Sequence, residues 1–139
     1  MKSKTIFYSV LLLMLSIQFS TAQNQKKNTV ISKNYCTEIG RFDLLIDNDE
    51  VAGSYLLIHK NALGGVWGRL KGNVMTGRWH DADGKGDIII TFTDDFSFFT
   101  ANYRSDDAPE KWYKDSWHGA LRPNENASFE FNNKTYTCE

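Results

Sequence analysis

Four stretches of the chain share one arrangement: a central glycine lies between two large apolar residues that are each two positions away. These stretches are residues 51–55, 66–70, 75–79 and 117–121, and residues 99–103 repeat the arrangement around an alanine. Because residues two apart in a strand share a face, each stretch would present large, small and large side chains on one face. Glycine inside a strand marks a bend or a close backbone approach. The pattern predicts a curved antiparallel sheet in which aromatic rings cover the gaps that the glycines leave.

Candidate strands follow one another at short intervals, and most are separated by two to four turn residues. Short strands at regular spacing are typical of an all-β sandwich or barrel, and such short links favour sequential antiparallel hairpins. No window of useful length shows helical periodicity. We therefore predict an all-β fold, an antiparallel up-and-down meander of about seven or eight strands curled into a small barrel. The candidate strands for this meander are residues 40–47, 51–59, 66–71, 74–80, 87–93, 96–104, 113–121, 128–131 and 134–138.

The first residues have the pattern of an export signal. Two lysines precede an apolar run over residues 6–17, and the small residues Ser20 and Ala22 precede the expected cleavage point. This pattern is typical of a secretory signal peptide, and the apolar run is too short for a confident membrane span. We expect residues 1–22 to be removed and the protein to be secreted or periplasmic.

The remaining chain divides into a leader and one domain. Residues 23–34 are polar and rich in lysine and asparagine, which predicts a flexible leader, and residues 35–139 form the expected single β-barrel domain. Cleavage removes two of the 16 basic residues and no acidic one, which leaves 14 against 17 and a net charge of −3. A mildly acidic chain without a basic cluster lacks the electrostatic footprint of a nucleic-acid-binding protein. No long apolar segment follows residue 22, so we expect no membrane span in the mature chain.

Cys36 and Cys138 are the only cysteines, and they lie near the two ends of the mature chain. In an oxidising compartment an isolated pair is most simply a disulfide. Here it would hold the end strands together near the point where the sheet closes. Two thiols are too few for a metal site without further ligands nearby. We expect neither a bound metal nor a cofactor.

Residues 81–87 resemble the start of a calcium loop of the EF-hand kind. Acidic residues occupy positions one, three and seven, and glycine occupies position six. Two positions depart from that pattern: Lys85 stands where a ligand oxygen belongs, and Phe92 stands where the loop needs a bidentate glutamate. A glycine-rich hairpin turn with solvated acids is the favoured interpretation, and weak calcium binding is the alternative.

The sequence offers little for catalysis. The histidines His59, His80 and His118 have no short ligand spacing, and we expect them on strands facing solvent. The Gly-x-Ser-x-Gly elbow of many hydrolases is absent. A glycosidase-like pair of carboxylates stays open as an alternative, although most acids fall in turns, where aspartate is expected for its backbone hydrogen bonding. The candidates for such a pair are Asp43, Asp47, Asp94, Asp95, Asp106 and Asp107.

Aromatic residues divide into two groups by strand parity. Tyr55, Trp79, Tyr103 and Trp117 occupy ends of the glycine-centred stretches and should face the core. The second group comprises Trp67, Trp112 and Tyr113, because Trp67 has the opposite parity and the other two lie at a polar connection. An exposed aromatic ring can stack on a sugar or bind a partner through its large contact area. We take Trp67, Trp112 and Tyr113 as the candidate ligand-binding residues.

Residues 40–121 resemble secreted bacterial β-meander domains in which Gly-x-Tyr, Gly-x-Leu-x-Gly, a Gly-x-Trp stretch and a later Phe-x-x-x-Tyr recur. These motifs stand here at residues 53–55, 68–72, 75–79 and 99–103. That group has no settled activity, so the resemblance implies a fold and carries over no functional residues. The glycine and aromatic pattern is also loosely similar to the avidin barrel, which implies a ligand held inside the barrel.

We therefore expect a secreted, non-catalytic binding domain whose partner is a saccharide or a cell-envelope surface. The alternative is an avidin- or calycin-like carrier of a small apolar ligand inside the barrel, and a second alternative is a small secreted hydrolase. The first two differ in where the inward aromatics lie. A barrel packed solid by Tyr55, Leu70 and Trp79 excludes a carrier, whereas an open mouth lined by them supports one.

Overall fold

The computed structural model describes residues 30–57, 60–122 and 128–137, which form ten strands and no α-helix. These ranges therefore contain no helix that is long and apolar enough to cross a membrane. The strands are β1 (Val30–Thr37), β2 (Gly40–Asp47), β3 (Glu50–Leu57), β4 (Ala62–Lys71), β5 (Val74–Asp81), β6 (Gly84–Phe92), β7 (Phe98–Ser105), β8 (Tyr113–Leu121), β9 (Ser128–Phe131) and β10 (Lys134–Thr137).

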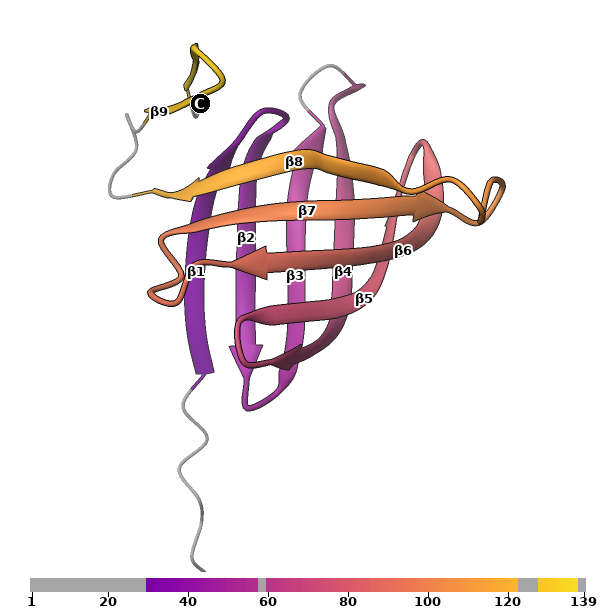
Figure 1. Ribbon diagram of the computed structural model, residues 1–139, viewed down its shortest axis with the longest axis horizontal. Helices are drawn as coiled ribbons and strands as arrows, with labels where there is room; N and C mark the ends of the chain where they lie inside the picture. Colours follow the sequence, from indigo (N-terminus) through magenta and orange to yellow (C-terminus); the bar gives the residue numbers. More distant parts are fainter. Residues whose placement is uncertain (1–29, 58–59, 123–127, 138–139) are drawn as a thin grey trace, which may run out of the picture.

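Strands β1 to β8 form a closed barrel in sequential order, which confirms the predicted antiparallel meander. Each strand pairs with the next, and β1 pairs with β8 through Cys36 opposite Ala120 and its two neighbouring positions. Figure 1 shows β1–β4 running down the molecule while β6–β8 run across them, so the barrel wall consists of two crossing layers. The core lies between these layers.

The interior follows from the alternation along each strand. In β2, for example, Phe42, Leu44 and Ile46 are buried between more exposed neighbours. The largest buried side chains form an aromatic cluster, and the Tyr35 hydroxyl donates a hydrogen bond of 3.0 Å to the carbonyl oxygen of Phe96 in the β6–β7 connection. This aromatic cluster fills the barrel toward that connection. Its members are Tyr35, Phe42, Phe92 and Phe99.

The glycines of the repeated stretches lie in strand interiors, but for two different reasons. A side chain at Gly53 or Gly119 would meet an aromatic ring of the adjacent strand, since its Cβ would lie 2.6 Å from the Phe42 ring or 2.2 Å from the Phe99 ring. This is the arrangement that the sequence predicted. Gly68 and Gly77 face each other across β4 and β5, and the atoms nearest to an added Cβ are backbone. There, glycine permits two backbones to approach closely where one layer turns into the other.

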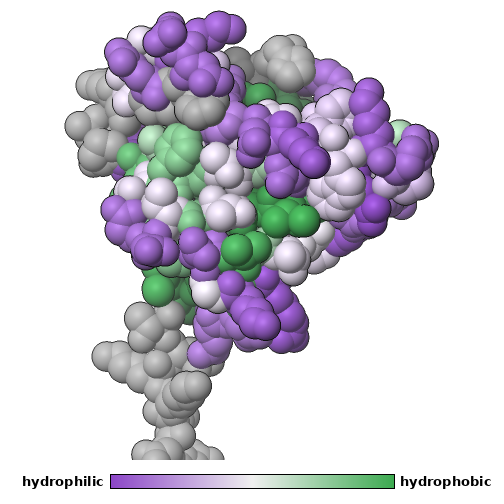
Figure 2. Space-filling model, in the orientation of Figure 1, coloured by the Kyte–Doolittle hydropathy of each residue, from purple (hydrophilic) through white to green (hydrophobic). Residues whose placement is uncertain are grey.

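Strand β1 begins earlier than composition suggested. Residues 30–34, which the sequence placed in the flexible leader, pair with the far end of β2. The order of apolar and polar residues did not reveal this part of the strand, because Val30 and Ile31 are apolar and yet 56 % and 44 % exposed. Figure 2 shows hydrophobic side chains at this start of the described chain. The expected signal peptide lies outside the described residues.

The last two strands do not extend the barrel. Strands β9 and β10 form a separate two-stranded sheet, drawn in yellow beside β1 and β8 in Figure 1. Tyr136 of this hairpin packs against Cys36, whose Sγ lies 3.9 Å from the Tyr136 carbonyl oxygen. Cys138 lies outside the described residues, so the disulfide stays a prediction. The hairpin nevertheless brings β10 to the strand that carries Cys36.

Candidate functional site

A cavity of about 300 Å³ lies at the end of the barrel opposite the aromatic cluster. It is bounded by the ends of β3, β5 and β7 and by the start of β8, and the β5–β6 and β7–β8 connections stand at this end in Figure 1. We call it the barrel mouth. Its lining is mostly apolar, and its polar groups are two carboxylates and the hydroxyls of one serine and two tyrosines. The lining residues are Ile39, Tyr55, Leu57, Trp79, Asp81, Asp83, Ile88, Tyr103, Ser116 and Trp117.

Two pairs of aromatic side chains form much of the wall of the barrel mouth. The rings of Tyr55 and Trp117 lie with centroids 5.3 Å apart, and those of Trp79 and Tyr103 lie 5.7 Å apart. Trp117 also packs on Phe42 at 4.8 Å, so the aromatic cluster supports the mouth from below. Parity placed all four wall residues on the inward face, as predicted. The barrel is thus packed at one end and hollow at the other.

The carboxylates of the barrel mouth have different partners. Asp81 accepts a hydrogen bond of 2.7 Å from the Tyr55 hydroxyl and another of 2.7 Å from the Asp83 backbone N–H. Asp83 forms an ion pair with Lys60. Burial raises the pKa of Tyr55 above its ordinary value, and the hydrogen bond to Asp81 raises it further. Tyr55 therefore stays protonated and donates to Asp81 throughout the physiological range.

Trp117 presents a hydrogen-bond donor that the protein does not use. Its side chain lines the barrel mouth, is 6 % exposed, and its indole Nε1 has no acceptor among the described residues. The indole of Trp79, by contrast, donates to the carbonyl oxygen of Arg104 at 3.0 Å. Buried polar groups in proteins are nearly always hydrogen-bonded. The Trp117 N–H therefore lies buried without an acceptor among the described residues, and it is the ring of Trp117 that contributes to the surface of the barrel mouth.

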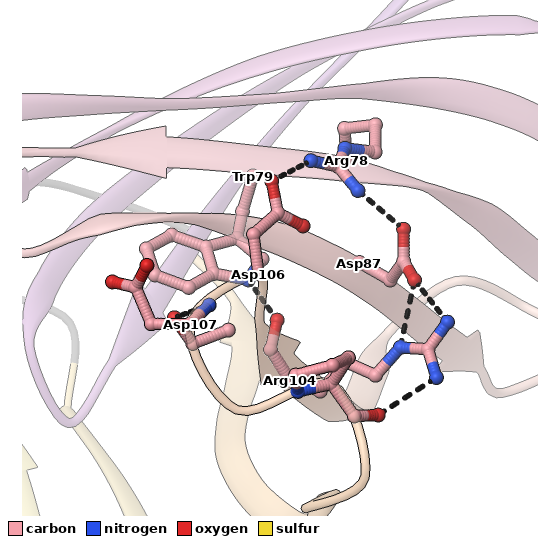
Figure 3. Close-up of polar contacts among 8 residues, drawn as sticks. Arg78, Trp79, Asp87, Arg104, Asp106 and Asp107 are labelled. Atoms are coloured by element: carbon pink, nitrogen blue, oxygen red, sulfur yellow. Dashed lines mark hydrogen bonds and ion pairs between the residues drawn. The ribbon is translucent and has the colours of Figure 1, made fainter.

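An ion-pair network on the outer surface holds one wall of the mouth in place (Figure 3). Asp87 accepts hydrogen bonds of 2.7 Å from both Arg104 and Arg78. Arg78 also binds Asp106, and Arg104 donates to the carbonyl oxygen of Pro109 at 2.9 Å. Hydrogen bonds from Arg104 and then Arg78 hold the pKa of Asp87 below its ordinary range. The network fixes the β7–β8 connection, which borders the mouth.

This network also bears on the calcium-loop alternative. Asp87 would be the seventh position of such a loop, but its carboxylate is held by two guanidinium groups on the outer face. Asp81 instead caps the turn of a β5–β6 hairpin, where Gly84 has a positive φ of 143°. Within residues 30–57, 60–122 and 128–137, no group of three histidine, cysteine or acidic side chains is placed to hold a metal ion.

The three predicted ligand-binding residues do not gather into one site. Trp67 is 50 % exposed on the outer face of β4, as its parity predicted. Trp112 is half-buried beneath the Arg104 guanidinium, which lies 4.9 Å from its ring centroid. Tyr113 is 37 % exposed and stacks on Tyr103 at 5.0 Å. Tyr113 thus stands directly behind the wall of the barrel mouth, whereas Trp67 lies several strands away.

One histidine differs from the expectation. His80 is exposed, but His118 is 5 % exposed, so the prediction that it faces solvent is wrong. The β1–β2 turn covers it: Glu38 accepts a 2.8 Å hydrogen bond from the His118 backbone N–H and contacts its Nδ1 at 2.5 Å. Strand parity could not anticipate that a turn covers the outer face. His59 lies outside the described residues.

The acids considered for a glycosidase-like pair are absent from the lining of the barrel mouth. Asp43 pairs with Arg41 on the outer face, and Asp106 belongs to the ion-pair network. Asp95 caps the β6–β7 turn, where hydrogen bonds from Ser97 and Thr93 lower its pKa to about 2. The carboxylates that do line the mouth are those assigned to the calcium-like turn. Sequence reasoning missed this role, although Asp81 shares the strand parity of the inward Trp79.

Comparison of the chain with protein-family models, with curated proteins and with solved structures finds no match. The likeness to glycine-rich bacterial meander domains and to avidin therefore stays a resemblance. Inference about function rests on the barrel mouth and on the exposed aromatic residues of the outer face.

Proposed function

We propose that the protein is a secreted, non-catalytic binding domain that holds a small, largely apolar ligand in its barrel mouth. The observation that carries this proposal is the cavity of about 300 Å³ lined by Tyr55, Trp79, Tyr103 and Trp117. Ligand sites are typically concave, mostly apolar and equipped with a few polar groups. The carboxylates of Asp81 and Asp83 and the hydroxyl of Ser116 supply those polar groups. Of the three residues named for this distinction, Tyr55 and Trp79 line an open mouth, as a carrier requires, whereas Leu70 packs against the core and is not among the lining residues.

The size of the cavity limits the ligand. A cavity of roughly 150 Å³ accommodates benzene in a protein core. A mouth of about 300 Å³ is twice as large, which suits a molecule of roughly 12 non-hydrogen atoms. This is at the lower end of the roughly 300–1,000 Å³ found for ligand sites. The proposed ligand is a single-ring or fused-ring compound and not a long lipid chain.

Fluorescence titration with 1-aminoanthracene, a neutral aromatic probe, tests this proposal. Ser116 lines the mouth and is solvent-exposed, so Ser116→Trp should fill the entrance without removing a core contact. We expect saturable binding to the wild type, a loss of at least about tenfold in affinity for Ser116→Trp, and unchanged affinity for the control Trp67→Ala. A wild-type protein that shows no saturable binding, or a Ser116→Trp variant that binds equally well, would refute the carrier function.

A saccharide or cell-envelope surface is the second candidate, and the exposure of Trp67 favours it. Trp67 pairs with Ala52, and Ala52 pairs with Leu45, so an apolar row crosses β2, β3 and β4 on the outer face. Leu45 and Trp67 are 52 % and 50 % exposed. A flat indole of this kind suits stacking on a sugar ring. Affinity electrophoresis on immobilised polysaccharides tests it: Trp67→Ala should lose retention while Ser116→Trp keeps it, the reverse of the pattern for the mouth.

A further inference from the structure

Building on the carrier function, we infer that the ligand of the barrel mouth is a small organic cation, with an amine or quaternary ammonium group on an apolar or aromatic body. The inference joins two features of the mouth: its unbalanced negative charge and its aromatic walls. It narrows the ligand from any small apolar compound to one chemical class.

The charge of the mouth is unbalanced. Asp81 and Asp83 are the charged residues of its lining, which contains no lysine, arginine or histidine. Lys60 pairs with Asp83 and offsets its charge. Asp81, in contrast, has neutral hydrogen-bond donors and no ion pair with any of the described residues. One negative charge therefore faces the cavity without a cation among the described residues to balance it.

The walls of the mouth suit the same kind of group. A cation within about 6 Å of an aromatic centroid is attracted by the negative face of the ring, most strongly by tryptophan. Four aromatic side chains line this cavity, and two of them are tryptophans. Their centroids lie 5.3 and 5.7 Å apart in pairs, so a cation beside one ring stays close to a second. Aromatic cages are a recurring protein environment for quaternary ammonium groups.

Other ligand classes fit the mouth less well. An anion would be placed in a largely apolar cavity beside Asp81, where repulsion and desolvation both oppose it. A neutral apolar ligand would leave the Asp81 charge partly desolvated and without a partner, which is costly. An ammonium group donates to the carboxylate and supplies the missing charge.

The test uses three probes that share one body and differ in charge: 4-phenylbutylamine, 4-phenylbutan-1-ol and 4-phenylbutanoate. Isothermal titration calorimetry at pH 7 and low salt measures the dissociation constant of each with the full secreted chain. We expect the amine to bind at least about tenfold more tightly than the alcohol, which corresponds to about 1.4 kcal/mol. We expect the carboxylate to bind more weakly than either.

Two variants assign the preference to one carboxylate. Asp81→Asn removes the charge and keeps one carbonyl oxygen for the Asp83 backbone N–H of the turn. Its amide NH₂ then faces Tyr55, whose hydroxyl can accept a hydrogen bond where it now donates one. The ratio of amine to alcohol affinity should fall at least about fivefold in this variant. Asp94→Asn removes the same charge from the β6–β7 connection, at the packed end of the barrel, and should keep the wild-type ratio. The unfolding transition of each variant shows whether it is folded.

The outcomes separate the inference from the function on which it rests. If the alcohol binds as tightly as the amine, the cation inference fails and the carrier function stands. If none of the three probes binds and 1-aminoanthracene also fails to bind, both fail. If the amine preference survives in a folded Asp81→Asn protein, Asp81 is not its source and the inference is overturned. Should Asp81→Asn not fold, the comparison of the three probes on the wild type decides.

Discussion

Replacement of Gly77 by alanine should be among the most damaging small substitutions in this barrel. The Cβ of an alanine at this position would lie 2.1 Å from the carbonyl oxygen of Trp67 and 2.7 Å from the Cα of Gly68. Ordinary contact begins near 3.4 Å, so β4 and β5 would have to separate by about 1.3 Å at this point. The obstructing atoms are backbone and cannot rotate away as a side chain can. The clash therefore has to be relieved by the strands themselves.

The expected loss of stability has two parts. Overpacking typically costs about 1–3 kcal/mol. Separating the strands also weakens the neighbouring ladder hydrogen bonds, each worth about 1 kcal/mol. Together they predict a loss of about 3 kcal/mol or more for Gly77→Ala, a large fraction of the roughly 5–15 kcal/mol typical of a small domain. Urea denaturation, followed by tryptophan fluorescence, measures the loss.

Gly65 provides a matched control in the strand that pairs with β5. An added Cβ there would meet the carbonyl oxygen of Gly53 at 3.6 Å, which is ordinary contact. Gly65→Ala should therefore be neutral or stabilise the protein by up to about 1 kcal/mol, because alanine restricts the unfolded chain. Equal midpoints for Gly77→Ala and Gly65→Ala, with unchanged denaturant slopes, would refute the argument that two backbones meet at this corner.

Three further predictions concern the expected disulfide, the core and the ion-pair network. The oxidised protein should contain a disulfide between Cys36 and Cys138, and its mass should rise by about 2 Da on reduction. Reduction should lower the free energy of unfolding by about 2–4 kcal/mol. An unchanged mass and an unchanged unfolding midpoint would show that this disulfide is absent. Trp117→Ala should cost about 3–5 kcal/mol because the ring is buried, whereas Trp67→Ala should cost less than about 1 kcal/mol; similar losses in thermal melts would contradict their assigned faces. Asp87→Asn should destabilise the protein by about 0.5–1 kcal/mol at pH 7. Because the folded-state pKa of Asp87 is depressed, this difference should persist at pH values above the ordinary 3.8 and decline as the pH falls from there through the folded-state pKa. A difference that stays constant throughout the acid titration would contradict the role of its charge.

The fold was accessible from sequence because strand periodicity and turn chemistry agreed along most of the chain. Glycine between large apolar residues placed Tyr55, Trp79 and Trp117 on the inner face, and the opposite parity of Trp67 placed it outside. The boundary of β1 was not accessible, because its first residues pair on one side only and bury little. The separation of the last hairpin from the barrel depends on long-range closure of β1 on β8, which local patterns do not encode.

The site was harder to predict than the fold. Strand parity identified the aromatic side chains that form the walls of the mouth. It could not distinguish a filled barrel end from a hollow one, because the free volume depends on the sizes of side chains that come from five or more strands. The turn composition of residues 81–87 drew attention to calcium and away from the cavity. Only the structure shows that Asp81 lines the mouth and that Asp87 pairs with arginines on the outside. Local sequence patterns could likewise not predict that the β1–β2 turn covers His118.

The indole N–H resonances of the four tryptophans test the central claim most directly. In a ¹H–¹⁵N correlation spectrum, assigned by single substitutions, Trp117 and Trp79 report on the barrel mouth, and Trp67 reports on the outer face. Saturation with 4-phenylbutylamine or 1-aminoanthracene should shift the Trp117 resonance most, because its ring lines the barrel mouth and would lie against the ligand. The Trp67 resonance should stay in place. A spectrum in which Trp67 moves and Trp117 does not would place binding on the outer face and contradict the proposed function of the barrel mouth.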